Sequence, residues 1–451
     1  MRQWLRTLFK RVTPAQVFVM GFSGFILLGS ILLTLPIATY AGRFRWLDAL
    51  FTSTSAVCVT GLILQDTGTT FTPFGQIVII TLCQIGALGV MTMSTLMALI
   101  LGKRIGLKER ILIQESWGQS DLEGVVRLIK KVVLFALAME VMGGIVLSLR
   151  FLKDFPFGQA VYYGFFHAVS SFCNAGFDVF GPVYGPFTNL THYLTDPWVM
   201  LTVAALAIIG GLGFPVLFEL AQQKEKKRLS VHTRLVLLIT GLLLALGTIF
   251  FLLLEFNNPA TLQKLDWPGK ILAAFFQSVT PRSVGFRALD LGEMRDASLF
   301  LMIVLMFIGA SPSSTGGGIK TVTFGVLLVT VRATVKGRED VELYERRLPK
   351  EVVYKALSVT AIALCAIFLV SMLLSITEKF SFFQILYEVT SAFSTVGLTT
   401  GITPYLSDFA RVMLIMMMFG GRVGLLTIAL ALTQRMQAGN VRYMEENVII
   451  G

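Results

Sequence analysis

Charged side chains are scarce in this chain. Asp, Glu, Lys and Arg make up 14% of its 451 residues, whereas hydrophobic residues make up 55%. Soluble domains carry about a quarter charged residues, and the mean hydropathy here is +0.74. This composition excludes a water-soluble fold and predicts an all-α integral membrane protein, because helices satisfy their own backbone hydrogen bonds in lipid.

Cysteine and histidine are also rare. The cysteines form no Cys-x-x-Cys pair, and no histidine has a second ligand at helical spacing. We therefore expect buried thiols without disulfides, no transition-metal centre and no covalent cofactor. The apolar segments contain no nucleophile–base set or paired acids, which argues against an enzyme. The residues concerned are Cys58, Cys83, Cys173, Cys365, His167, His192 and His232.

Long apolar runs alternate with short ones. A membrane-spanning helix needs about 20 apolar residues, whereas a run of 10–14 is typical of a re-entrant segment. The long runs are 17–39, 74–101, 125–149, 198–220, 234–254, 299–331, 356–376 and 412–432. The short runs are 46–56, 160–172, 270–279 and 382–393. Each short run lies between two long ones, so the pattern predicts helix, re-entrant loop, helix.

This pattern repeats four times. Each short run leads into a stretch with a glycine, and these glycines are Gly61, Gly176, Gly285 and Gly397. A period of about 110 residues, with a dipping segment in each unit, is a stronger signal than any single motif. We predict four pseudo-symmetric units around a central pore, at 13–101, 125–221, 233–331 and 352–433, followed by a C-terminal tail at 434–451.

The basic residues indicate the orientation. They are concentrated at the N-terminus and between the units, at 103–131, 224–234 and 332–355, whereas the connections within units are richer in acidic residues. By the positive-inside rule, both termini lie in the cytoplasm and the re-entrant loops enter from outside the cell membrane. Topology thus accounts for much of the net charge of +11, and the charge does not indicate nucleic-acid binding.

Four non-helical segments at one depth predict a shared aqueous cavity, because unpaired backbone groups cannot face lipid. A ring of backbone carbonyls replaces the water shell of a monovalent cation, and the C-terminal end of each short helix favours positive charge. Asp48, Asp178 and Glu388 are expected near the outer mouth, where acidic side chains concentrate cations. The predicted ion-binding residues are Val59, Thr60, Gly61, Asn174, Ala175, Gly176, Ser283, Val284, Gly285, Thr395, Val396 and Gly397.

These motifs resemble the Trk/Ktr/HKT superfamily of potassium transporters, most closely its KtrB-type pore subunits. The resemblance covers nearly the whole chain and is carried by all four loops, Thr67-Gly68-Thr69, Phe74-Gly75-Gln76 and the stretches 308–321 and 419–424. It implies that the four loop glycines form a potassium filter, and that glycine rather than serine at Gly61 favours K⁺ over Na⁺. It also implies a homodimer whose contact includes 448–451, and a cytosolic ring of nucleotide-binding RCK (KtrA-like) subunits.

Two features interrupt the later units. The run 299–331 contains a polar, glycine-rich break, which predicts a mobile gate below the third loop; the alternative is a static kink. The break comprises Gly309, Ala310, Ser311, Pro312, Ser313, Ser314, Thr315, Gly316, Gly317 and Gly318. Arg422 lies within the last apolar run and predicts an electrostatic barrier, or else a structural arginine satisfied by carbonyls. Lys320 is expected at a helix end, with its amine reaching the membrane surface.

The sequence is also compatible with other functions. A Na⁺- or H⁺-coupled symporter with alternating access is the main alternative, although such folds show inverted repeats and these units run in one direction. A conduit preferring sodium or ammonium is also compatible with the sequence. Activation by Na⁺, the coupling mechanism, the selectivity ratio, the identity of the regulatory subunit and the role of Glu140 are left undecided by the sequence.

Overall fold

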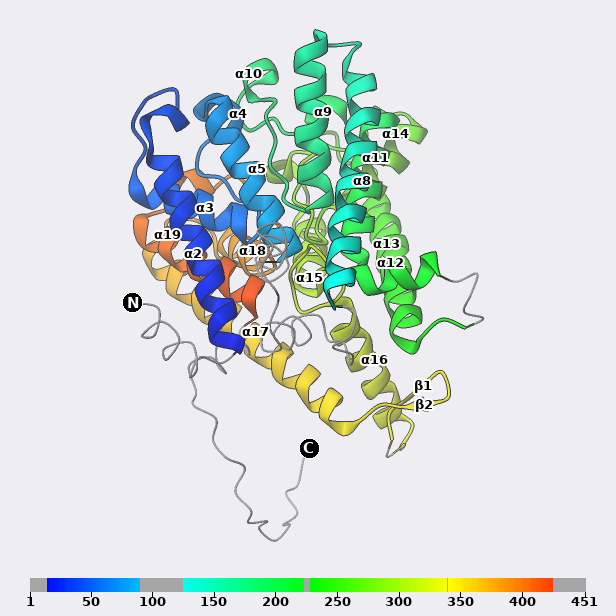
Figure 1. The fold of residues 1–451 in the computed structure, drawn as a ribbon. Coiled ribbons are helices and arrows are strands. Elements are labelled where there is room, and N and C mark those ends of the chain that lie inside the picture. The colour runs from blue at the N-terminus through cyan, green and yellow to red at the C-terminus, as the bar shows by residue number, and fades with distance from the viewer. Residues whose placement is uncertain (1–13, 90–124, 223–227, 339, 425–451) are drawn as a thin grey trace.

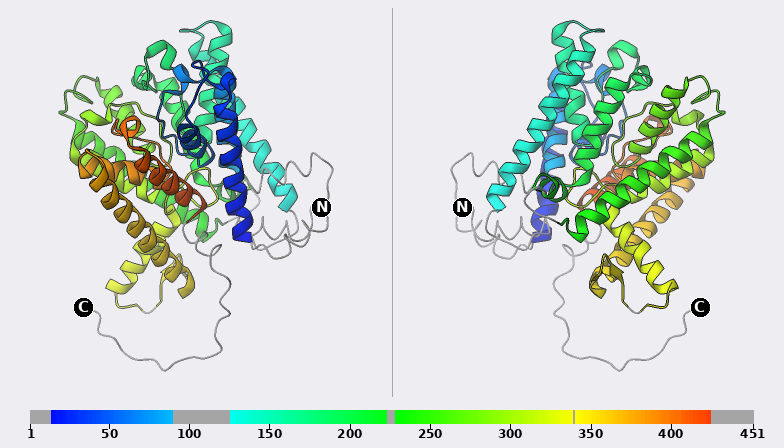
Figure 2. Two further views of the ribbon diagram at one scale, coloured as in Figure 1. Left: turned by 90° about the vertical axis from the view of Figure 1, so that its left-hand side faces the viewer. Right: turned by 90° about the vertical axis from the view of Figure 1, so that its right-hand side faces the viewer.

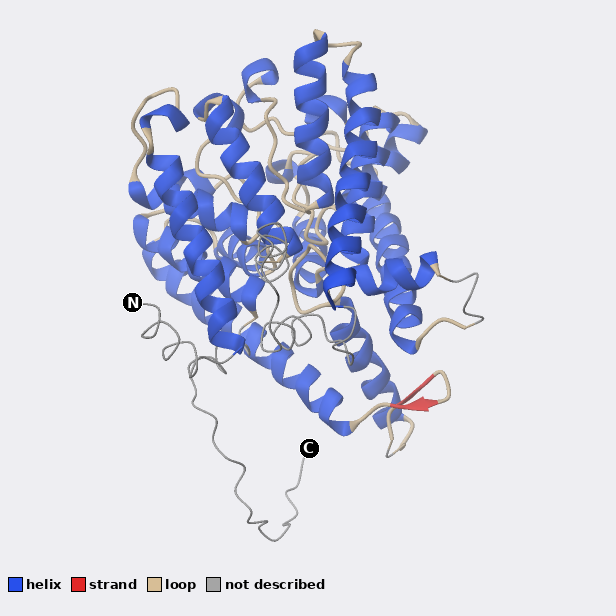
Figure 3. Cartoon of the chain, in the orientation of Figure 1, coloured by secondary structure: helices blue, strands red, loops and turns tan. Residues whose placement is uncertain are grey.

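The computed structural model describes residues 14–89, 125–222, 228–338 and 340–424. These residues are mostly helical, as predicted (Figures 1 and 3). The strands among them are β1 (Glu342–Leu343) and β2 (Arg346–Arg347), which pair in an antiparallel hairpin. The predicted tail 434–451, with the proposed dimer contact 448–451, lies outside the described residues, as does the segment 90–101.

Four long helices begin the four predicted units. They are α2 (Pro14–Thr34), α8 (Val125–Phe151), α13 (Val231–Glu255) and α17 (Lys350–Thr377). Within them, Ile129–Phe151, Val231–Glu255 and Lys350–Thr377 are long and apolar enough to cross a membrane. On α17, large apolar side chains face outward, with Phe368 55%, Met372 62% and Ile376 74% exposed. Such a continuous apolar surface is suited to lipid rather than to water.

Four shorter helices follow at the predicted positions: α3 (Trp46–Val57), α9 (Phe157–Phe172), α14 (Trp267–Val279) and α18 (Phe382–Phe393). Each packs against the long helix before it. Asp266 caps α14 by accepting from Gly269 N, and Ser381 forms a capping box with Gln384 on α18. These caps satisfy free amides at the helix starts. The C-terminal halves of all four helices are buried, so their carbonyl ends point into the molecule.

Four further helices follow the short ones in the described residues. They are α5 (Pro73–Leu88), α11 (Pro197–Leu212), α15 (Asp296–Ile308) and α19 (Asp408–Val423). Each ends at a glycine with positive φ, namely Gly89 (84°), Gly213 (90°), Gly309 (68°) and Gly424 (90°). The apolar runs 74–101, 198–220 and 412–432 are therefore interrupted at Gly89, Gly213 and Gly424, because this backbone conformation ends a helix and suits glycine. After Gly213 the chain turns by 98° into α12 (Phe214–Ala221).

The remaining elements lie at the two ends of the bundle. At one end, α4 (Thr67–Thr70) and α10 (Gly181–Tyr184) lie close together over the short helices (Figure 1). At the other, α16 (Thr321–Val335), the hairpin and the start of α17 project from the body of the molecule (Figure 2). Single 3-10 turns at Pro36–Ala38, Thr191–Tyr193, Leu291–Glu293 and Thr403–Tyr405 complete the connections.

All four cysteines lie in the described residues and are free. Cys58, Cys83 and Cys173 are buried, as expected for small apolar side chains. Cys365 is exposed on α17, so the expectation that all four are buried is wrong for this residue. It shares its surface with the outward-facing apolar residues of that helix.

Candidate functional site

The four short helices lead into four turns that share a left-handed backbone at two positions. We call them turn 1 (58–61), turn 2 (173–176), turn 3 (282–285) and turn 4 (394–397). The final glycine of every turn has positive φ, between 67° at Gly176 and 88° at Gly397. Two positions earlier, a non-glycine residue is also left-handed: Val59 (56°), Asn174 (58°), Ser283 (67°) and Thr395 (48°). A conformation rare for side chains that recurs at one position of all four turns indicates a shared structural requirement.

The turns contact each other in a closed ring. A methyl group added at Gly61 would lie 2.3 Å from Ala175 O in turn 2, and one at Gly176 would lie 2.9 Å from the carbonyl carbon of Gly285 in turn 3. One at Gly285 would lie 2.1 Å from Val396 O in turn 4, and one at Gly397 would lie 2.1 Å from Thr60 O in turn 1. Each glycine thus permits a backbone–backbone approach that a Cβ would block.

A cavity of about 50 Å³ lies against the ring. Of the acidic residues expected at this mouth, only Asp178 lines it. Asp48 is instead paired with Arg411 at 2.8 Å, and buried Glu388 accepts from Thr403 Oγ1 at 3.1 Å. The lining residues are Gly61, Ile63, Gly176, Asp178, Phe187, Asn189, Gly285, Arg287, Gly397, Leu398 and Thr399.

Two residues at the mouth are missed by the sequence analysis. Asn189 donates from Nδ2 to Gly176 O at 3.3 Å, and its Oδ1 accepts from Arg287 N at 3.3 Å. Arg287 brings positive charge to the cavity that Asp178 lines. Both residues lie in non-periodic connections, so no local pattern marks them.

The segment 309–318 lies directly against the ring. Gly317 N donates to Ser283 Oγ at 2.7 Å, and Ser283 Oγ donates to Thr395 O at 2.9 Å. On another side, Ser311 N and Thr315 N donate to the carbonyls of Gly211 and Gly210 near the end of α11, at 3.0 and 3.2 Å. The segment is therefore a hydrogen-bonded loop between turn 3 and α11, and we call it the plug.

Arg422 links this segment to two helices. From α19 its guanidinium donates to Thr315 O in the segment and, at 2.5 Å, to Gly86 O on α5. Backbone carbonyls thus satisfy the arginine, as the structural alternative predicted, and one of those carbonyls belongs to the predicted gate. Lys320 lies at the start of α16, but its Nζ donates to Gly316 O at 2.6 Å. The expectation that it reaches the membrane surface is wrong, because a nearer carbonyl accepts it.

Glu140 acquires a partner in the structure. Gln84 on α5 donates from Nε2 to Glu140 Oε1 at 2.7 Å, and Cys173 Sγ donates to Gln84 Oε1 at 3.0 Å. This buried chain ties α8 and α5 to the start of turn 2. A buried acid with a hydrogen-bond donor avoids the desolvation penalty of an isolated one.

The arrangement is suited to binding a small dehydrated cation. Four helix C-termini converge on a ring of backbone whose carbonyls are strong electron-pair donors. In the described ranges, no group of three His, Cys, Asp or Glu side chains is positioned to hold a metal ion. Cation binding at the ring would therefore rest on the backbone.

Comparisons with known proteins agree on one family. A family model described as TrkH, cation transport protein, matches residues 12–443. The chain is 42% identical to the Ktr system potassium uptake protein B of Bacillus subtilis over 441 residues, covering 98% of this chain and 97% of that protein. It is 39% identical to the protein of the same description in Vibrio alginolyticus, covering 97% and 94%. It is 38% identical to the potassium/sodium uptake protein NtpJ of Enterococcus hirae, covering 98% of each.

A solved structure has the same fold. The crystal structure of the potassium transporter TrkH from Vibrio parahaemolyticus superposes with a TM-score of 0.71 and 18% sequence identity. The superposition covers 92% of this chain and 83% of that one. At this identity, the likeness concerns the arrangement of helices and not the chemistry of the site.

Proposed function

The chain belongs to the TrkH family of cation transport proteins, and on that premise we propose that it is the membrane pore subunit of a potassium uptake system. The observation that carries the proposal is the closed ring of turns 1 to 4, each held by a glycine against its neighbour. K⁺ would leave its water shell for carbonyls of the residues ending at Gly61, Gly176, Gly285 and Gly397. Four short-helix C-termini add a favourable field.

The control of flux is assigned to the plug at 309–318 and to Arg422. The plug is held against the ring by Ser283 and against α5 and α19 by Arg422. Transport requires this segment to move aside, and the arginine adds a positive charge next to the path. Both features are predicted to lie on the cytoplasmic side of the ring.

The proposed assembly is supported by membership of the family and by the charge distribution. Four units at 13–101, 125–221, 233–331 and 352–433 surround one pore in a multi-pass protein of the cell membrane, with both termini in the cytoplasm. The functional form is a homodimer with a cytosolic RCK ring. A relative is described as a potassium/sodium uptake protein, which supports Na⁺ as an activating ion or as a second cargo.

The test is potassium-limited growth of a transport-deficient bacterium that expresses the chain with a matched cytosolic partner. Rescue at low K⁺ is expected, and failure to rescue with the protein present in the membrane contradicts the proposal. In the same strain, Gly61→Ser should lower K⁺ uptake and shift the remaining uptake toward Na⁺, because the added side chain crowds Ala175 O in turn 2. An unchanged K⁺ preference would remove Gly61 from the filter.

A further inference from the structure

Turn 3 differs from the other three turns in one buried charge. Three positions before the glycine, turns 1, 2 and 4 carry Cys58, Cys173 and Ser394, which are small and neutral. Turn 3 carries Arg282 at this position. An arginine is always charged in a protein, so turn 3 carries a permanent positive charge that the other three turns lack.

Arg282 is buried without a counter-charge. The residue is 7% exposed, its Nη2 donates to Thr240 Oγ1 at 3.4 Å, and its Nε has no hydrogen-bond partner. Among the ion pairs of the described residues, none includes Arg282. A buried charge normally has an oppositely charged partner or several hydrogen bonds.

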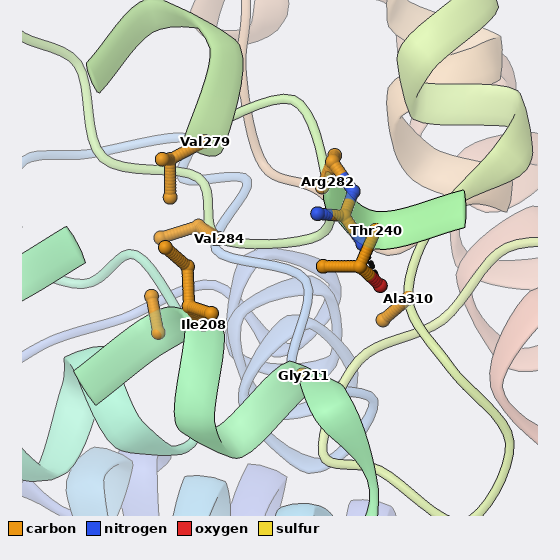
Figure 4. Close-up of a pocket in the computed structure, with 8 residues that line it drawn as sticks. Ile208, Gly211, Thr240, Val279, Arg282, Val284 and Ala310 are labelled. Carbon is orange, nitrogen blue, oxygen red and sulfur yellow. Dashed lines mark hydrogen bonds between the residues drawn. The ribbon is translucent and has the colours of Figure 1, made fainter. Parts of the chain in front are cut away.

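The space beside the guanidinium is too small to neutralise it. The cavity there has a volume of about 10 Å³, which is room for roughly one water molecule. Figure 4 shows Arg282 and Thr240 on one side of it and Val279, Val284 and Ile208 on the other. The apolar side chains of that wall carry no counter-charge. Arg282 follows the end of α14 at Val279 by three residues, and the carbonyl end of a helix favours a positive charge.

This placement has a consequence for cations in the ring. A fixed positive charge therefore already lies near the helix end that would attract a cation at turn 3, since Arg282 and Val279 line the same small cavity. At a separation on the order of 10 Å and an effective dielectric constant of about 20, a like charge weakens the binding of a monovalent cation on the order of tenfold. Weaker binding also means faster release, which a conducting site requires.

We propose that Arg282 sets the cation affinity of the ring, acting as a permanent positive charge behind turn 3 that weakens binding and accelerates release. The inference rests on the proposed function of the ring as a cation filter. It differs from the role assigned to Arg422, which bonds to carbonyls of the plug and of α5. Arg282 acts through its field alone.

The experiment measures cation binding and uptake by the purified full-length chain in liposomes. Arg282→Met removes the charge and keeps the length of the side chain, so the dissociation constant and KM for K⁺ should fall about tenfold while kcat also falls. Arg282→Lys keeps the charge at an assay pH below the lowered pKa of a buried lysine, and at that pH it should stay within threefold of wild type. Thr240→Val removes the hydrogen bond but leaves the charge, and it should change KM less than twofold.

A second variant covers the case in which Arg282→Met does not fold. Thr240→Asp places a carboxylate beside the guanidinium and neutralises it without truncating it, so the same tightening is expected. Unchanged KM in either neutralising variant, or Arg282→Lys behaving like Arg282→Met, overturns the proposal.

The series is run with K⁺, Na⁺ and Rb⁺. The ranking of the variants by KM tests the role of Arg282 with any cation that binds. The preference of the wild type among the three cations tests the potassium function. A wild type that prefers Na⁺, with Arg282→Met still tightening Na⁺ binding, would sink the potassium proposal and leave this one standing.

Discussion

The ring of turns repeats one backbone geometry four times, whereas the second helices, the plug and Arg422, which form the layer beneath the ring, differ from unit to unit. In the ring, all four turns have the same signs of φ and the same kind of glycine contact with a neighbour. In the layer beneath, all four second helices end at a glycine, yet the plug at 309–318 follows only α15, and Arg422 lies on α19 alone. In the proposed filter, this shared backbone geometry would present equivalent carbonyls to the cation from all four turns. A gate, in contrast, does not need fourfold repetition, because one obstructing segment is enough to close a single pore.

The largest effect is expected from closing the ring contact itself. Gly397→Ala places a methyl group 2.1 Å from Thr60 O, between two backbones that cannot yield. Uptake of K⁺ should fall by on the order of 100-fold, since a misplaced ligand set loses several kcal/mol of cation stabilisation. Uptake is measured with Rb⁺ as tracer at matched protein levels in the membrane.

The matched control is Gly401→Ala. Gly401 also has positive φ (94°), but an added methyl group meets nothing within 4 Å. It tests backbone strain without the ring contact, and uptake should stay within threefold of wild type. Equal losses in the two variants would show that φ strain, and not ring closure, explains the defect.

Removing the plug is expected to have the next largest effect, in the opposite direction. The backbones at Gly309 and Gly318 are adjacent, since a methyl group on Gly309 would lie 2.8 Å from Gly318 Cα. A deletion of 311–318 can therefore be closed without stretching the chain. Uptake without the cytosolic partner should rise about tenfold, as expected if about 1.4 kcal/mol of closure is lost. Lost uptake by a correctly folded deletion variant would refute the gate assignment.

Arg422→Gln should raise partner-independent uptake by a smaller factor of about threefold, because it removes one of several contacts of the plug. Arg422→Lys separates the two roles of the arginine. It keeps the positive charge but not the forked geometry that reaches both Thr315 O and Gly86 O. If Arg422→Lys behaves like wild type, the positive charge holds the plug in place. If it behaves like Arg422→Gln, the hydrogen bonds to Thr315 O and Gly86 O do. Reduced uptake in Arg422→Gln would contradict both roles.

The smallest effect is predicted for Ser283→Ala, which removes the contact between the two layers. Gly317 N loses its acceptor and Thr395 O loses a donor, a change typically worth about 1–3 kcal/mol when the group stays buried. We expect a change of about twofold in the ratio of K⁺ to Na⁺ uptake, because other contacts still hold the plug against the ring. The same substitution in the 311–318 deletion should have less effect, because one partner is already gone. Equal effects in both backgrounds would show that Ser283 does not couple plug and ring.

The repeated parts of the structure are those that the sequence predicts best. The four short helices lie where apolar runs of about re-entrant length predict them. The predicted starts of α9 and α14 are three residues late, at Ala160 instead of Phe157 and at Lys270 instead of Trp267. Their first turns contain polar residues or proline, which a search for apolar runs passes over.

The unrepeated parts depend on contacts that no local pattern encodes. Arg422 reaches Gly86 across 336 positions of sequence, and Gln84 reaches Glu140 across 56. Glycines in apolar runs are also ambiguous, since most serve helix packing. For this reason the sequence does not identify Gly89, Gly213 and Gly424 as helix ends. Their role follows only from their positive φ.

The left-handed residues Val59, Asn174, Ser283 and Thr395 have a consequence for the stiffness of the ring. Each holds a backbone conformation that costs about 1–3 kcal/mol for a residue with a side chain. Glycine would relieve this strain, but it would also give the turn many other conformations. Side chains at these positions therefore restrict the carbonyls of the turns to one orientation, whereas glycine would allow several. Engineering these positions to glycine should make the protein more tolerant of mutation and its cation site less discriminating.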